Sequence, residues 1–166
     1  MKKTELRDAI LQQLHLELAR QTSAVELAHD EAISEESRAE SKWDTHSQEA
    51  AYLAEGQAKL ADEIAGSIEL YGALRLPDFG TGDVIALGAL VQVEPAVPSR
   101  SKTARASYFL GPRAGGLELN DGGRQVLVLT PQSPLGRQLL GKRVGDVVQS
   151  PGRGTASVQQ RIASVE

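Results

Sequence analysis

Apolar residues recur at spacings of three, four and seven through the first half of the chain, where they form two series. The first is Leu6, Ile10, Leu14, Leu18, Val25, Ala28 and Ala32, and the second is Leu53, Leu60, Ile64, Ile68 and Tyr71, with Gln57 between. Such spacing places the apolar side chains on one face of a helix and suits a coiled-coil seam. Because residues 4–72 hold no proline, we predict two antiparallel helices joined by a turn within residues 33–44.

The pattern changes after Pro77 to short runs rich in Val, Ile and Leu, separated by glycine and proline. The runs that predict strands are 83–93, 104–110, 125–130, 147–150 and 157–165, with Gly88 marking a bulge in the first. Turn-forming residues gather at 95–101, 115–116, 120–123 and 151–154. We therefore predict an α+β protein with an N-terminal antiparallel α-helical coiled-coil hairpin at residues 1–76 and a small β-rich domain at residues 77–166.

One short helix is specified within the second domain. Ser133 suits the N-cap, Pro134 the first helical position, and Gly141 the position just past the end. The apolar face of this helix would consist of Leu135, Leu139 and Leu140.

The two predicted domains carry opposite charge. Residues 1–76 hold 8 Lys and Arg against 15 Asp and Glu, a net charge of −7, whereas residues 77–166 hold 10 against 7, a net charge of +3. Binding to a nucleic-acid backbone needs cations that displace counterions, so the acidic domain argues against simple DNA binding. A metal ion or a basic protein channel would attract it instead.

Several classes of protein are excluded by what the sequence lacks. It has no cysteine, which excludes disulfides, thiolate zinc sites and cysteine nucleophiles. It has no apolar run near the roughly 20 residues of a membrane span, and its start is charged where a signal peptide is apolar. It also lacks the glycine motifs of phosphate and dinucleotide sites and the nucleophile elbow. We expect a soluble, cytoplasmic protein with no membrane contact.

Carboxylates gather around the predicted turn. They are Asp30, Glu31, Glu35, Glu36, Glu40, Asp44 and Glu49, with only Arg38 and Lys42 among them. Glu36, Glu40 and Asp44 are spaced by four, so a helix would place them on one face, where like charges repel. A divalent cation relieves such repulsion, and Mg²⁺ takes one or two protein carboxylates together with water and phosphate. The alternative interpretation is a solvated helix end.

The stretch from Ser133 to Val148, SPLGRQLLGKRVGDVV, follows two long predicted helices. This arrangement resembles the C-terminal domain of the Gre family of transcription elongation factors, GreA and GreB. Segments within residues 42–58, among them KWDTHS, YLA and GQA, resemble a divergent subgroup of that family. The resemblance implies an FKBP-like fold for residues 77–166 and a monomeric cytoplasmic protein among the DNA-binding proteins of transcription.

In the Gre family the hairpin enters the secondary channel of RNA polymerase, where two acids at its tip help to hold the second active-site Mg²⁺. The polymerase then cleaves backtracked RNA, so the factor is a cofactor of the polymerase and not an enzyme. For this chain the resemblance implies RNA polymerase as the partner and indirect contact with nascent RNA. It also implies no cofactor in the free protein and a Mg²⁺ ion shared with the polymerase active site. The residues expected to contact the polymerase are Arg137, Lys142, Arg143 and Trp43.

The tip departs from the family pattern, in which an Asp and a Glu three apart precede Asn-Ala-Glu-Tyr. Counted back from Tyr52, these two acidic positions fall on Thr45 and Gln48, and the acids Asp44 and Glu49 lie one residue outside them. Either the tip has shifted its register or the chain has lost the ability to stimulate cleavage.

A shifted register gives specific candidates. Glu40 and Asp44 would present two carboxylates to the catalytic Mg²⁺, and Glu36 would be the next candidate. Trp43, the only tryptophan, has two interpretations, as a staple between the helix ends and as an anchor in a pocket of the polymerase.

A second function class is a chaperone or prolyl isomerase, suggested by the FKBP-like fold of the resembling domain and by a hairpin able to grip clients. Fold alone does not decide function. Isomerase pockets of that fold are lined by aromatic rings, whereas residues 77–166 hold only Phe79, Tyr108 and Phe109. A chaperone hairpin would also present apolar tips, and this one ends in carboxylates. Both observations favour a regulator of RNA polymerase.

Overall fold

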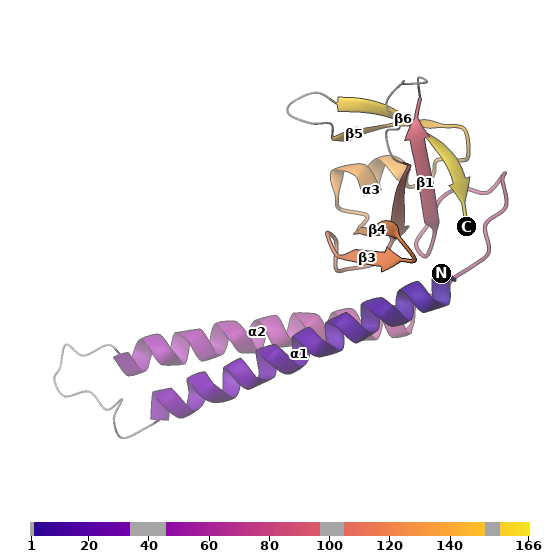
Figure 1. Cartoon of the computed structure of the whole chain (residues 1–166). Coiled ribbons are helices and arrows are strands. Elements are labelled where there is room, and N and C mark those ends of the chain that lie inside the picture. The colour runs from indigo at the N-terminus through magenta and orange to yellow at the C-terminus, as the bar shows by residue number, and fades with distance from the viewer. Residues whose placement is uncertain (1, 34–45, 97–104, 152–156) are drawn as a thin grey trace. The chain divides into compact units, whose positions relative to one another are not determined.

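The computed structural model describes residues 2–33, 46–96, 105–151 and 157–166, and Figure 1 shows their elements. The chain forms two compact units. The sheet unit consists of Met1–Ile10 together with Leu70–Glu166, and the helix-pair unit consists of Leu11–Glu69. The base of each long helix thus belongs to the sheet unit, and the domain boundary expected at residue 76 stays a prediction.

Two long helices fill the first half of the chain, α1 at Lys3–Ile33 and α2 at His46–Gly72. They confirm the helices predicted within residues 4–72, and within the helix-pair unit they lie side by side (Figure 1). Partly or fully buried positions in this unit include a series spaced by three and four residues, as in a coiled-coil seam. These positions are Leu14, Leu18, Gln21 and Val25 in α1, and Ala54, Gln57, Ala61, Ile64 and Ile68 in α2.

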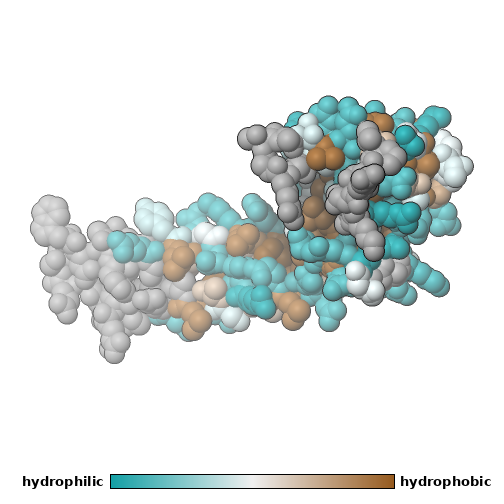
Figure 2. Space-filling model, turned by 45° about the horizontal axis from the view of Figure 1, so that its top comes forward, coloured by the Kyte–Doolittle hydropathy of each residue, from teal (hydrophilic) through white to brown (hydrophobic). Residues whose placement is uncertain are grey.

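The apolar series predicted for α2 matches the observed seam except at two positions in its first half. Leu53 and Leu60 are 54% and 41% exposed, and the seam holds Ala54 and Ala61 instead. The prediction gave weight to side-chain size, but the separation of two packed helices depends on the side chains at their contact, and alanine permits a short one. Figure 2 accordingly shows apolar side chains scattered among hydrophilic ones along the surface of the helices.

The second half of the chain forms a six-stranded sheet in the order β3-β4-β2-β1-β6-β5. The elements are β1 (Leu90–Pro95), β2 (Ala106–Leu110), β3 (Glu118–Asp121), β4 (Arg124–Leu129), α3 (Pro134–Leu139), β5 (Val147–Pro151) and β6 (Ser157–Val165). Neighbouring strands are antiparallel except β2 and β4, which run parallel. The predicted α+β class is confirmed.

The first predicted strand, over residues 83–93, is too long. The strand begins only at Leu90, and the segment before it bonds to the turn after α3. The N–H of Ile85 donates to the carbonyl of Lys142 at 2.8 Å, and the N–H of Gly141 donates to the carbonyl of Ile85 at 2.9 Å. The apolar residues of this segment are thus held outside the sheet.

Two further predictions need correction, the bulge at Gly88 and the turn at residues 120–123. Gly88 does not form a bulge: it has a φ of +85° in the turn before β1, and a Cβ there would lie 2.6 Å from the carbonyl oxygen of Arg75. The register of β1 shifts later, between Gln92 and Val93. The segment 120–123, expected to be only a turn, includes the end of β3, a strand missed because Asn and Asp are poor strand formers.

Buried side chains lie on both faces of the sheet, because successive residues of a strand point to opposite faces. Leu129 of β4 belongs to a core cluster with Leu135 and Leu139 of α3. Val128, its neighbour, lies near Tyr71 at the base of α2, since a Cβ placed on Gly111 would meet both. The bases of the long helices therefore contribute to the core of the sheet unit, through the fully buried Leu6, Ile10 and Tyr71.

Candidate functional site

The short helix α3 has the caps that the sequence predicts. Ser133 Oγ accepts a hydrogen bond from the N–H of Gly136 at 3.0 Å and donates to the carbonyl of Thr130 at 2.8 Å. Pro134 is the first helical residue, and Gly141 after the end has a φ of +76°. Gly136 permits the close approach to β4, because a Cβ there would lie 2.0 Å from the carbonyl oxygen of Thr130. The direction of α3 is therefore fixed by its first turn.

The side chain of Gln138 forms hydrogen bonds with the main chain at the outer edge of β5. Its Oε1 accepts from the N–H of Gln149 at 2.9 Å, and its Nε2 donates to the carbonyl of the same residue at 3.1 Å. Because β5 is the last strand of the sheet, its outward main-chain groups would otherwise lack a partner. The two bonds also hold α3 against β5, so α3 is anchored along its length.

The three cations expected to contact a partner lie at α3 and the turn that follows. Arg137 and Arg143 are exposed, and Lys142 is half-buried. The N–H of Arg143 donates to the Asp146 carboxylate at 2.9 Å, and the N–H of Asp146 donates to the carbonyl of Arg143 at 3.1 Å, which orders the turn. None of the three side chains forms an ion pair with a residue that the structure describes. Their charges can therefore meet an acidic surface.

An open cavity of about 580 Å³ lies between α3 and the sheet. Its floor includes Leu127, Leu129 and Leu135, and none of the residues that line it is charged. Burial raises the pKa of the Tyr108 phenol in the wall, and a hydrogen bond with Ser150 opposes this rise. A cavity of this composition suits an uncharged, largely apolar group.

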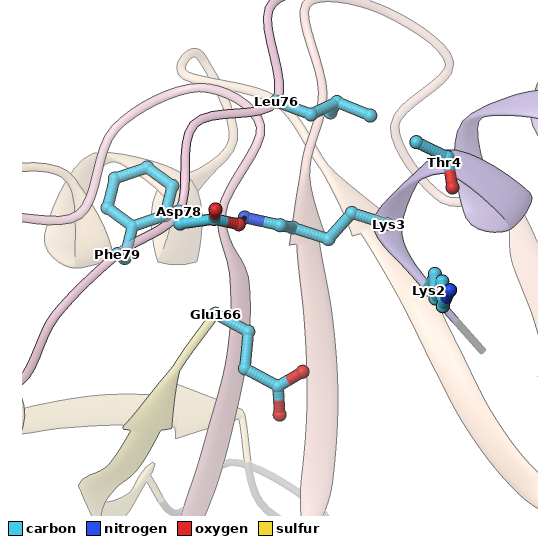
Figure 3. Close-up of a pocket in the computed structure, with 7 residues that line it drawn as sticks. All are labelled: Lys2, Lys3, Thr4, Leu76, Asp78, Phe79 and Glu166. Atoms are coloured by element: carbon cyan, nitrogen blue, oxygen red, sulfur yellow. Dashed lines mark ion pairs between the residues drawn. The ribbon is translucent and has the colours of Figure 1, made fainter.

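A second cavity, of about 430 Å³, is lined by the start of α1, by Leu76, Asp78 and Phe79, and by Glu166 (Figure 3). Lys3 points from α1 toward Asp78 in this view. Its Nζ donates to the carbonyl of Pro77, lies 4.0 Å from a carboxylate oxygen of Asp78 and 5.1 Å from the centre of the Phe79 ring. Only 11% of its side chain is exposed. This burial lowers the pKa of Lys3, and the charges of Asp78 and Glu166 oppose the shift.

Tyr71 ties the base of α2 to the sheet. Its hydroxyl donates to the carbonyl of Arg113 at 2.8 Å, and burial raises the pKa of the phenol strongly. A Cβ on Gly111 would lie 2.0 Å from the Tyr71 hydroxyl oxygen, so only glycine leaves room for the ring. The base of α2 is thereby fixed within the sheet unit.

The expected tip residues lie outside the described residues: Glu36, Glu40 and Asp44 as metal ligands and Trp43 as a contact. Within the part of the chain that the structure describes, no three His, Asp or Glu side chains are grouped so that they could hold a metal ion. Over the same residues, no helix combines the length and apolar character that crossing a membrane requires.

Sequence reasoning missed the roles of Gln138 and Lys3. Gln138 bonds to a strand eleven residues later, and Lys3 bonds to Pro77, 74 residues away. Polar contacts over such distances leave no periodic pattern in the sequence. Tyr71 is part of such a pattern, as the last member of the second apolar series, whereas no pattern in the sequence marks Gly111.

No family model matches the chain, and no curated protein matches its sequence. Solved structures do match. GreA factor homolog 1 (Gfh1) of Thermus thermophilus is 20% identical over 94% of each chain, with a TM-score of 0.39. Gfh1 of Thermus aquaticus is 20% identical over 93% of this chain and 92% of its own, also with a TM-score of 0.39. The prokaryotic transcription elongation factor GreA/GreB from Nitrosomonas europaea is 20% identical over 66% of this chain and 78% of its own, with a TM-score of 0.38. At TM-scores below 0.5 these matches establish neither family nor function.

Proposed function

We propose that the protein binds RNA polymerase and regulates transcription elongation, with its helical hairpin inserted in the secondary channel. The observation that carries the proposal is the segment SPLGRQLLGKRVGDVV, which resembles the Gre family and begins with the capped helix α3. This unit presents Arg137, Lys142 and Arg143 without an ion-pair partner among the described residues. The solved structures above bear names of the same class, but their TM-scores add no weight.

The geometry around α3 supports docking through this surface. The N-cap at Ser133 and the hydrogen bonds of Gln138 hold α3 by both ends, so the backbone that carries Arg137 needs little ordering when a partner binds. Charged groups at the rim of an interface mainly steer association, which makes the partner surface an acidic one. The polymerase would thus be held by the sheet unit while the hairpin reaches the channel.

The docking surface is tested by charge reversal. Arg137→Glu with Lys142→Glu should weaken binding to core RNA polymerase at least about tenfold, because like charges would then face one another. The matched control is Arg75→Glu with Arg113→Glu, which reverses two exposed cations of the same unit. Binding would be measured by surface plasmon resonance, with circular dichroism as the check on folding. Equal binding by the two double variants would remove this surface from the proposal.

The hairpin would act at the polymerase active site. We propose that Glu40 and Asp44, with Glu36 as the next candidate, offer carboxylates to the Mg²⁺ shared with the polymerase, and that Trp43 contacts the channel. Glu40→Gln with Asp44→Asn should abolish RNA cleavage in stalled elongation complexes at limiting Mg²⁺ while polymerase binding is retained. If the unchanged protein stimulates no cleavage at any Mg²⁺ concentration, the hairpin acts by occupying the channel alone.

The cavity beside α3 does not favour the chaperone or isomerase alternative. Tyr108 is the single aromatic residue among those that line it, whereas an isomerase pocket of the FKBP-like fold has several aromatic rings. A prolyl isomerase assay on a proline-containing peptide checks this directly, and we expect no acceleration over the uncatalysed rate.

A further inference from the structure

Lys3 has an environment that the other described lysines do not share. Its ammonium lies within a cavity of about 430 Å³, beside the Pro77 carbonyl, the Asp78 carboxylate and the Phe79 ring (Figure 3). Lys59, by contrast, is exposed and paired with Glu55 at 2.9 Å, which raises its pKa. Burial lowers the pKa of Lys3 instead. A larger fraction of Lys3 is therefore the neutral amine, which is the nucleophilic form of lysine.

The cavity offers room and complementary groups for a small acyl donor. Leu76 and Phe79 form an apolar wall for an acyl chain, while Lys2 and the hydroxyl of Thr4 are donors for an anionic leaving group. The carboxylates of Asp78 and Glu166 repel negative charge and so disfavour donors that carry more than one phosphate. A short acyl phosphate satisfies these conditions, since it joins an apolar acyl group to one phosphate.

We propose that Lys3 is an acylation site, at which a small acyl phosphate transfers its acyl group to Nζ and loosens the start of α1 from residues 77–79. The ammonium first gives up one proton to solvent water. The neutral Nζ then attacks the carbonyl carbon and forms the amide bond. The bond from that carbon to the phosphate oxygen breaks, and phosphate leaves with the electron pair and takes up the proton that the nitrogen loses as the amide forms. The products of the whole reaction are one acyl-lysine, one hydrogen phosphate and one proton.

The modification removes the interactions that depend on charge. An acylated Nζ is neutral, so the ion pair with Asp78 and the cation–π contact with Phe79 are lost. The acylated nitrogen keeps a single N–H and can donate only one hydrogen bond, where the ammonium has three donors. The first turn of α1 and residues 76–79 should then open more often, while the Tyr71 contact keeps the base of α2 in place. This inference goes beyond the proposed function and does not depend on a polymerase.

The test compares rates of acetylation by acetyl phosphate, residue by residue, using mass spectrometry of the full chain. Each rate is measured in the folded protein and again in urea, and expressed relative to Lys142. We expect the relative rate of Lys3 to be at least about twofold higher in the folded protein than in urea, and that of Lys59 to be lower. If Lys3 reacts more slowly in the folded protein, burial protects it and the proposal is wrong.

Three variants test the environment assigned to Lys3 and the structural consequence of its acylation. Asp78→Asn removes a charge that raises the pKa of Lys3 and that repels the donor, so the acetylation of Lys3 should become faster. A slower reaction would contradict the assigned environment. Lys3→Gln mimics the neutral product and should speed amide hydrogen exchange at residues 3–10 and 76–79, whereas Lys3→Arg keeps the charge and should not. Equal exchange in these two variants would show that acylation has no structural consequence.

Discussion

The sheet unit and the helix-pair unit differ in how deeply they bury their side chains. The largest fully buried side chains, among them Tyr71, Phe109, Leu6 and Ile10, all belong to the sheet unit. Among the described residues of Leu11–Glu69, Ile64 is the one buried apolar residue, with 8% of its surface exposed. The sheet unit is therefore stabilised by buried side chains on both faces of its sheet, and the helix-pair unit by a single seam between two helices.

This contrast is relevant to the proposed roles of the two units, which are docking by the sheet unit and channel entry by the hairpin. A unit with a deep core opens only at a large cost in free energy, whereas a narrow seam permits local opening at a smaller one. A docking surface gains from the first property because its charges stay in place. If the hairpin enters a channel, as proposed, it gains from the second, since small adjustments of its helices cost little. The two units are thus suited to different parts of one task.

The largest expected effect comes from truncating one buried apolar side chain in each unit. Phe109→Ala in the sheet unit should lower the free energy of unfolding by about 3–5 kcal/mol, because it removes a fully buried ring. Ile64→Ala in the helix-pair unit should cost about 2 kcal/mol, since the seam lies close to solvent. Urea unfolding followed by circular dichroism gives both values. Equal losses would mean that the seam is packed as tightly as the core.

A polar position in the seam offers a way to strengthen the weaker unit. Nε2 of Gln21 donates to Glu17 at 2.7 Å, but its Oε1 is buried and has no hydrogen-bond partner among the described residues. An unsatisfied buried acceptor costs about 1–3 kcal/mol, so Gln21→Leu should raise the free energy of unfolding by about that amount.

The control is Gln13→Leu, which makes the same change at an exposed position of α1. Amide hydrogen exchange within residues 11–33 should slow for the first variant and stay nearly unchanged for the second. Faster exchange in Gln21→Leu would show that the glutamine has a partner in solution and fixes how the helices pair.

Periodicity and turn chemistry allowed the main elements to be predicted. The caps of α3 at Ser133 and Gly141 are local, and the structure confirms them. Two positions in the seam of α2 were misassigned because periodicity shows where apolar residues recur but not how close two backbones come, and Ala54 and Ala61 decide that here. The clamp of Gln138 on Gln149 could not be predicted, since it depends on which strand ends the sheet.

A smaller effect is expected from the hydroxyl of Tyr71 in the sheet unit. At neutral pH, Tyr71→Phe loses the hydrogen bond to the carbonyl of Arg113 and should lower the free energy of unfolding by about 1 kcal/mol. Burial raises the pKa of Tyr71 in the folded state, while an unfolded tyrosine ionises near pH 10. Above about pH 10 only the unfolded state gives up this proton, so the unchanged protein loses stability as the pH rises.

The phenylalanine variant has no such proton, and the difference between the two proteins should shrink above about pH 10 and then reverse. Urea unfolding at a series of pH values measures the difference directly. Tyr52 provides the matched control, because it is 75% exposed, and Tyr52→Phe should leave the difference near zero at every pH. A constant difference between Tyr71→Phe and the unchanged protein would mean that the phenol ionises equally in both states.

The last prediction concerns two substitutions of glycine by alanine. They should change the free energy of unfolding in opposite directions in the two units. Gly56 lies inside α2 in the helix-pair unit, and a Cβ added there meets no atom within 4 Å. Gly56→Ala should therefore raise the free energy of unfolding by about 0.5–1 kcal/mol, because alanine loses less conformational entropy in a helix. Gly88→Ala in the sheet unit should lower it, since its φ of +85° and the Arg75 carbonyl at 2.6 Å both oppose a Cβ. Thermal unfolding of the two variants checks the prediction, and a stabilised Gly88→Ala would show that the turn before β1 relaxes as easily as the helix pair.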